Sequence, residues 1–209
     1  MVRATEIPLA DILPLTAGVT DAGHLTLGGC DAVELAGVFG TPLYVFDEET
    51  LRGQCRAFQE AFQSRYHNSI VAYAAKAYLG RALASIIAQE GMSLDVVSGG
   101  ELAVAASVGF PAERIHFHGN NKSEQELREA LDYGIARIVV DNFHELQLLN
   151  GIAQGRGVRQ KILSIPIAKA WPRSRSRLVA LPHCSTSSRI SRVWVSALCQ
   201  SIGMRLISR

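Results

Sequence analysis

The sequence predicts an α/β protein in which short parallel strands alternate with helices. Short apolar runs rich in β-branched residues recur along the chain, and each is followed by a longer helical pattern. The composition, with 48% hydrophobic and 19% charged residues, is that of an ordinary globular protein. This alternation favours a parallel sheet, either an open doubly wound sheet or a closed (β/α) barrel. Periodicity alone leaves both architectures open.

Residues 1–40 are expected to form a β appendage ahead of the alternating region. Glycine and proline recur every few residues there, which is typical of short extended pieces joined by turns. From Thr41 the pattern changes, and residues 41–162 repeat strand and helix. Ser123 as an N-cap and Glu126 three residues later form a capping box that predicts the start of one helix. In chain order we expect strands at 43–46, 70–74, 93–97, 115–117, 135–140 and 161–165, with helices at 48–63, 80–90, 100–108, 124–133 and 142–149.

Lys76 is the candidate catalytic residue. It stands at the end of an otherwise uncharged, strand-like run, residues 71–78. A buried lysine loses its proton more readily, and the free amine can then attack a carbonyl carbon and form a Schiff base. The alternative is a lysine at a strand end whose charge extends into solvent.

Three segments closely resemble the diaminopimelate decarboxylase family when they are taken in order. They are Tyr-Ala-Ala-Lys at 73–76, Leu-Asp-Val-Val-Ser-Gly-Gly-Glu-Leu at 94–102 and Ile-His-Phe-His-Gly-Asn-Asn-Lys-Ser at 115–123. The family belongs to the alanine-racemase-like, fold type III decarboxylases, which use pyridoxal 5'-phosphate. The similarity runs from about residue 40 to residue 162. It implies the decarboxylation of meso-2,6-diaminopimelate to lysine and carbon dioxide.

The resemblance also implies the domain organisation. Residues 41–162 would be the first half of a pyridoxal phosphate-binding (β/α) barrel, and residues 1–40 would join a mostly β second domain. Residues 163–209 match no family segment, and we expect them to be irregular. A parallel sheet that does not close leaves an unpaired edge strand, which favours aggregation.

The resemblance assigns three residues to the cofactor site. Lys76 would bond the cofactor, Asp95 would lie near it at a strand end, and His118 would line the mouth of the site. Asp95 has an alternative role as a helix cap, and the His118 loop has one as a purely structural turn. The glycines after Ser98 fit either an anion-binding helix start or a plain turn. We expect Lys122 to be exposed and protonated, which leaves Lys76 as the better Schiff-base lysine.

Several family segments have no match after Ile162. The missing segments are the histidine that stacks on the ring, the glycine-rich phosphate loop, the acidic partner of the ring nitrogen and a Cys-Glu-Ser segment. Cys184 and Cys199 lack the neighbouring glutamate. The tail after about Leu163 is rich in serine and arginine, as expected of a gene read out of frame. The alternatives to an out-of-frame tail are a divergent tail and a basic nucleic-acid-binding arm. We therefore expect the chain as given to be an inactive fragment.

Charge and cysteine usage exclude other classes of function. A net charge of +2 indicates neither nucleic acid nor membrane as a partner, and the four cysteines lack zinc-site spacing, so no metal is expected. The absence of a signal peptide and of a membrane-spanning run predicts a cytoplasmic location. The expected partner is a small amino-acid substrate, and the family is homodimeric. Alternatives are a decarboxylase acting on ornithine, arginine or carboxynorspermidine, a non-catalytic pyridoxal phosphate carrier, or an interaction partner of an intact homologue.

Overall fold

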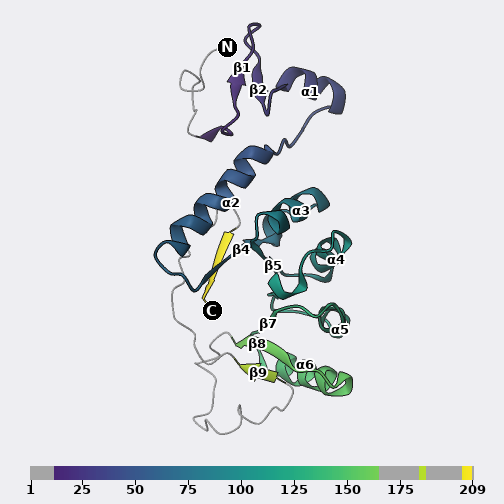
Figure 1. Ribbon diagram of the computed structural model, residues 1–209. Helices are drawn as coiled ribbons and strands as arrows, with labels where there is room; N and C mark the ends of the chain where they lie inside the picture. The colour runs from purple at the N-terminus through teal and green to yellow at the C-terminus, as the bar shows by residue number, and fades with distance from the viewer. Residues whose placement is uncertain (1–11, 165–183, 187–203, 209) are drawn as a thin grey trace. The chain divides into compact units, whose positions relative to one another are not determined.

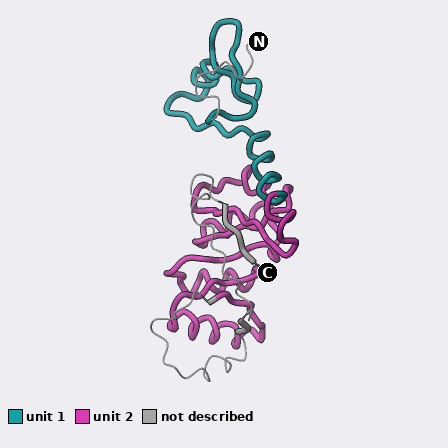
Figure 2. The backbone as a smooth tube through the Cα atoms, turned by 90° about the vertical axis from the view of Figure 1, so that its left-hand side faces the viewer, with its two compact units in different colours: residues 1–60 teal, residues 61–209 magenta. Residues whose placement is uncertain are grey.

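The computed structural model describes residues 12–164, 184–186 and 204–208 (Figure 1). The chain divides into two compact units, residues 1–60 and 61–209 (Figure 2). Most of the tail that was expected to be irregular lies outside the described residues. Its two described segments, Cys184–Thr186 and Met204–Ser208, are strands.

The first unit contains a small antiparallel sheet followed by a helix. Its strands β1 (Gly18–Val19), β2 (Leu25–Leu27) and β3 (Cys30–Asp31) lie in the order β1-β2-β3. Helix α1 (Ala32–Phe39) was not predicted. Its start is nevertheless encoded locally, because the Asp31 side chain accepts a hydrogen bond of 2.7 Å from the Val33 amide as an N-cap.

The strand predicted at 43–46 is wrong, because these residues are irregular. Their side chains are apolar but exposed, and Tyr44 is 90% exposed. A strand requires a neighbour to pair with, and the described part of the first unit supplies none at this segment. High β-propensity was therefore not sufficient here.

Helix α2 (Glu48–Gln63) follows at the residues that were predicted. Asp47 stabilises its start, since its carboxylate accepts hydrogen bonds from the Thr50 amide at 2.9 Å and from the Thr16 hydroxyl at 2.8 Å. One residue of the helix, Cys55, is fully buried.

The second unit is a seven-stranded sheet in the order β10-β4-β5-β6-β7-β8-β9. Neighbouring strands from β4 to β9 are parallel, and β10 pairs antiparallel with β4. The strands are β4 (Ser69–Ala74), β5 (Ser93–Val96), β6 (Ile115–Phe117), β7 (Arg137–Val140), β8 (Gln160–Ser164), β9 (Cys184–Thr186) and β10 (Met204–Ser208).

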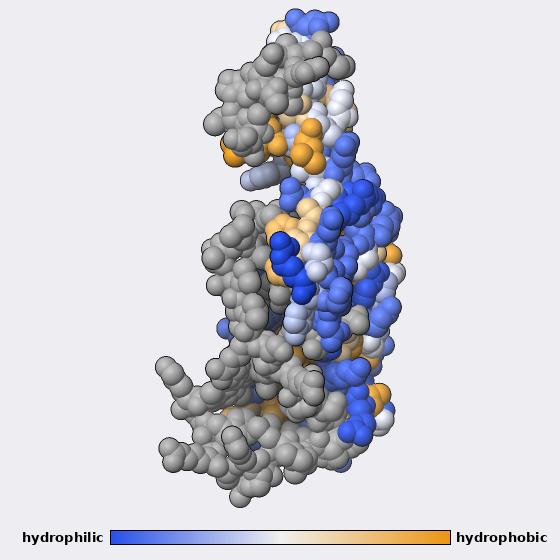
Figure 3. Space-filling model, turned by 60° about the vertical axis from the view of Figure 1, so that its left-hand side comes forward, coloured by the Kyte–Doolittle hydropathy of each residue, from blue (hydrophilic) through white to orange (hydrophobic). Residues whose placement is uncertain are grey.

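Helices connect the consecutive parallel strands from β4 to β8 and lie along one face of the sheet (Figure 1). They are α3 (Arg81–Gln89), α4 (Gly99–Ser107), α5 (Glu124–Tyr133) and α6 (Phe143–Arg156). Two short 3-10 turns, η3 (Ala75–Ala77) and η4 (Ala112–Arg114), also join elements. The exposed face shown in Figure 3 is mostly hydrophilic along this unit, as expected where amphipathic helices turn polar residues outward. The predicted alternation of strand and helix is confirmed.

The strand register separates an apolar face from a polar one. Ala74, Asp95, His116 and Arg137 are successive register partners on β4 to β7, so their side chains share one face. The opposite face carries fully buried apolar side chains. Each of these contributes about 1.5–3 kcal/mol by burial. The apolar set is Leu94, Val96, Ile115, Phe117 and Ile138.

Candidate functional site

Lys76 lies directly after β4, in the middle of the 3-10 turn η3. The Tyr73 hydroxyl donates a hydrogen bond of 2.8 Å to the carbonyl oxygen of Tyr78, which closes this turn around the lysine. Lys76 itself is exposed. The buried setting expected of a Schiff-base lysine is therefore not found, and the amine reaches solvent, as in the alternative of a strand-end lysine.

Asp95 and His118 come together at the same end of the sheet. Asp95 is 2% exposed on β5, in register with Ala74 of β4, and η3 contacts β5. His118 follows β6, and its Nδ1 lies 3.5 Å from Oδ2 of Asp95. The alternative role of Asp95 as a helix cap is wrong, because Ser98 caps α4 by accepting from the Glu101 amide.

His116 is a buried neighbour of Asp95 that the sequence analysis missed. It is 1% exposed, and neither ring nitrogen has a hydrogen-bond partner among the described residues. Burial and the nearby positive charge of Arg137 lower its pKa to about 4, against the opposing effect of Asp95. The ring is therefore neutral near pH 7. Strand alternation was the available signal, because His116 shares a face with Asp95.

The glycine turn between β5 and α4 is held by two carboxylates. Glu101 accepts from the Val97 amide at 2.7 Å, and Glu126 of α5 accepts from the Gly99 amide at 2.7 Å. A Cβ at Gly99 would lie 3.0 Å from Cγ of Glu126. Of the two roles expected for this turn, the structure favours the structural one, since a protein carboxylate already takes the Gly99 amide.

Glu101 and Glu126 differ in how their surroundings affect ionisation. Burial raises the pKa of Glu101, with the hydrogen bond from Val97 opposing the rise and Asp95 adding to it. Burial also acts to raise the pKa of Glu126, but hydrogen bonds from Ser123 and Gly99 outweigh it, so the pKa falls. Glu126 Oε2 accepts from the Ser123 amide at 2.8 Å, which completes the predicted capping box.

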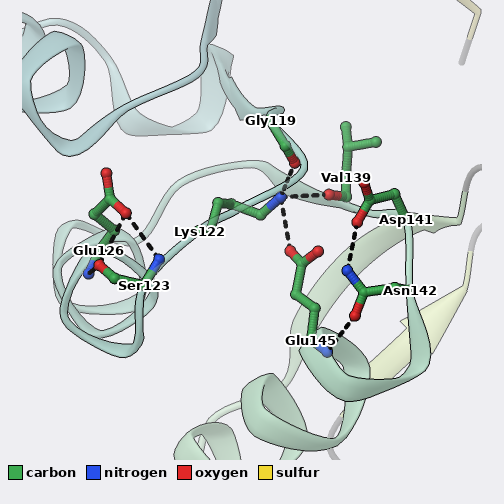
Figure 4. A network of polar contacts seen from close by, with 8 residues as sticks. All are labelled: Gly119, Lys122, Ser123, Glu126, Val139, Asp141, Asn142 and Glu145. Carbon is green, nitrogen blue, oxygen red and sulfur yellow. Dashed lines mark hydrogen bonds and ion pairs between the residues drawn. The ribbon is translucent and has the colours of Figure 1, made fainter.

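The expectation that Lys122 is exposed is wrong. Its side chain is 1% exposed, and its Nζ lies 2.7 Å from Oε1 of Glu145 (Figure 4). The same ammonium donates to the carbonyl oxygens of Gly119 and Val139. Lys122 is thus held inside the fold and does not offer an accessible amine.

Two other kinds of feature are absent from the part of the chain that the structure describes. No group of three His, Cys, Asp or Glu side chains there comes together in a way that could hold a metal ion. None of its helices combines the length and the apolar character needed to cross a membrane. A hollow of about 410 Å³ lies between α5 and α6, but Lys76, Asp95 and His118 do not line it.

Comparisons with known proteins cover most of the described chain. Residues 48–178 match the family model described as "Pyridoxal-dependent decarboxylase, pyridoxal binding domain". Diaminopimelate decarboxylase of Bacillus methanolicus is 49% identical over 148 residues, which is 71% of this chain and 34% of that protein. Diaminopimelate decarboxylase of Bacillus subtilis is 53% identical over 135 residues, 65% of this chain and 31% of that protein.

A solved structure agrees in fold. Diaminopimelate decarboxylase from M. jannaschii, in complex with L-lysine, superposes with a TM-score of 0.67 at 34% identity. The match covers 72% of this chain and 35% of that one. The chain spans about a third of the length of the curated relatives it matches.

The matched region contains every residue proposed for the site. Lys76, Asp95 and His118 all fall within residues 48–178, and the match extends past Ile162, where the resemblance was expected to stop. The predicted resemblance and the α/β fold with its partial barrel are confirmed. The out-of-frame tail and the expected inactivity stay predictions. The chain belongs to the pyridoxal-dependent decarboxylase family, whose pyridoxal-binding domain it carries.

Proposed function

We propose that this chain carries the cofactor-bonding lysine of an enzyme that decarboxylates meso-2,6-diaminopimelate to lysine and carbon dioxide. One observation carries the proposal: Lys76 is exposed in a turn at the carboxyl end of β4, beside the strand that holds Asp95. Barrel enzymes display their catalytic groups at this end of the strands. The substrate is proposed from the names of the relatives, which are diaminopimelate decarboxylases.

The residues present fit pyridoxal phosphate by their chemistry. Lys76 offers an accessible primary amine to the aldehyde, and Asp95 and His118 present a carboxylate and an imidazole at neighbouring strand ends. When bound, this cofactor takes up the electron pair that remains when carbon dioxide leaves. Lys76 would hold it covalently through its side-chain amine.

The protein residues would then orient the reactants. The hydrogen bond from Tyr73 to Tyr78 keeps the turn around Lys76 in shape. Asp95 faces Nδ1 of His118, so the carboxylate sets the orientation of the imidazole at the mouth of the site. His116, neutral and buried, lies beside Asp95 in register on the same face of the sheet.

We also propose a cytoplasmic enzyme that takes a small amino-acid substrate and has no nucleic-acid or membrane partner. The resemblance also suggests a homodimer in the whole family enzyme. This chain, which lacks a match to the Cys-Glu-Ser segment of that dimer, is not expected to form it properly.

Borohydride trapping tests the role of the lysine. The full chain is incubated with pyridoxal phosphate, reduced, digested and mapped by mass spectrometry. We expect the label on Lys76 and its loss in Lys76→Arg. Lys161→Arg, which changes another exposed lysine, is the matched control and should leave labelling unchanged. Equal labelling of Lys76 and Lys161 would show that the attachment is not specific.

The same trapping separates the substrate alternatives. Adding meso-diaminopimelate before reduction should lower labelling of Lys76 more than ornithine or arginine does at equal concentration. Stronger displacement by ornithine or arginine would favour another basic-amino-acid decarboxylase. A label that none of these amino acids displaces would favour a non-catalytic carrier.

A further inference from the structure

The Lys122–Glu145 ion pair is buried at the site end of the sheet, and the proposed reaction uses neither residue. The two side chains are 1% and 5% exposed, and their charged atoms are 2.7 Å apart. Lys122 lies in the loop after β6, and Glu145 lies in the first turn of α6, after β7 (Figure 4). The pair therefore joins two neighbouring strand ends.

The ammonium of Lys122 ties three segments together. It donates to the Gly119 carbonyl in its own loop and, at 2.9 Å, to the Val139 carbonyl at the end of β7. Glu145 of α6 supplies the opposite charge. Glu145 is itself fixed, because its amide donates to the Asn142 side chain at 2.8 Å as α6 begins.

The loop that this lysine closes begins with His118. The His118 amide donates to the Val96 carbonyl at 2.7 Å, which anchors it to β5. Gly119 follows with φ of +93°, and a Cβ there would lie 3.0 Å from the Val97 carbonyl oxygen. The chain thus passes very close to the end of β5, and the bond from Lys122 to Gly119 holds it there.

Stability alone is a poor explanation for this pair. Burial raises the pKa of Glu145, with Lys122 opposing the rise, so the carboxylate is costly to keep charged. Asp141 adds to the rise, and the Lys122 ammonium, 2.7 Å from Oε1 of Glu145, supplies the opposing charge. Apolar side chains of similar volume would fill such a site as stably or more so.

We infer that the Lys122–Glu145 pair positions His118 beside Asp95, by clamping the His118–Lys122 loop to the ends of β7 and α6. Lys122 is on this account a positioning residue and does not touch the reactants. The consequence for cofactor binding rests on the proposed function, whereas the clamping of the loop does not.

The double variant Lys122→Met with Glu145→Leu separates positioning from stability. It removes both charges while keeping apolar volume, so it should unfold at a higher urea concentration than Lys122→Met alone, which leaves Glu145 without a counter-charge. Pyridoxal phosphate should nevertheless bind about tenfold or more weakly, as expected when a supporting group is lost. The His118 amide should exchange its hydrogen faster, because the loop is no longer clamped.

Arg156→Met is the matched control. Arg156 and Asp132 also join α5 and α6, with atoms 2.7 Å apart, but on the exposed side of these helices. Its loss should change neither cofactor affinity nor exchange at His118. If the double variant binds pyridoxal phosphate like the unchanged chain and protects the His118 amide equally, the positioning role is wrong. If Lys76 is not labelled in the unchanged chain, the proposed function is wrong. Hydrogen exchange at the His118 amide still tests whether the ion pair holds the loop in place.

Discussion

The ends of β5, β6 and β7 differ from the end of β4. Past β5 to β7, polar side chains reach from one loop to the next: Glu126 holds the Gly99 turn, and Lys122 holds the β7 end through Val139. Past β4, the turn that carries Lys76 is closed by Tyr73, and the lysine is exposed. The linked loops after β5 to β7 suit a rigid, preformed side of a binding site, and the turn after β4 suits an accessible point of attachment. A covalently held cofactor requires both.

The largest effect on stability is expected when one partner of the buried Lys122–Glu145 ion pair is removed. Lys122→Met alone leaves Glu145 buried without a counter-charge, which should lower the free energy of unfolding by about 3–5 kcal/mol. Arg156→Met, which removes an exposed, solvent-screened pair, should cost far less. Urea denaturation of both variants measures the difference. Equal costs would mean that the buried pair is no more important than a surface one.

The second largest effect, on the pH dependence of stability, concerns the buried and neutral His116. Its pKa in the folded chain is about 4, below the ordinary 6.5, so between these values the unfolded chain binds more protons. His116 should therefore contribute a rise in stability of about 3 kcal/mol from pH 4 to pH 6.5, and this contribution is lost as the pH falls. His116→Leu should flatten this slope, whereas His67→Leu, which changes an exposed histidine, should not. Urea midpoints across this range test it.

A smaller effect on stability is expected at Gly119, where the loop after β6 passes close to the end of β5. Gly119→Ala combines a positive φ with a Cβ 3.0 Å from the Val97 carbonyl oxygen, and should cost about 1–3 kcal/mol. Gly157→Ala at the end of α6 has a φ of +64° but no atom within 4 Å of the added Cβ. Its cost measures the backbone strain alone. A Gly119→Ala cost no larger than that of Gly157→Ala would argue against the close approach.

The smallest effect on stability is expected at the Lys76 turn. Tyr73→Phe removes the hydrogen bond to Tyr78 and should cost about 0.5–1.5 kcal/mol. Tyr133→Phe removes a similar bond, 2.7 Å to the Phe110 carbonyl, and should cost as much. Only Tyr73→Phe should also lower borohydride labelling of Lys76. Equal labelling in the two variants would mean that Tyr73 does not shape the turn.

The sequence predicted the elements whose signals are local. The capping box of Ser123 and Glu126 marked the start of α5, and the short apolar run before it marked β6 at its observed bounds. The strand expected at 43–46 failed, because strand formation depends on a partner that the local sequence does not reveal.

The site was predicted unevenly for the same reason. The nearness of His118 to Asp95 was not predicted, but the place of Lys76 after a strand followed from the motifs. The setting of Lys122 did not, because its polar neighbours suggested exposure while its partner Glu145 lies on the next helix. Burial of a charge is decided by such distant partners, so local composition is a poor guide to it.

Glu126 has a further consequence for how the second unit folds. One of its oxygens accepts from Ser123 at the start of α5, and the other accepts from Gly99 at the start of α4. A single carboxylate thus completes the first turn of two consecutive helices, so fraying of one removes a cap from the other. Strand-helix units linked in this way should gain and lose structure together, with cooperativity passing from each unit to its neighbour as it does along a repeat protein.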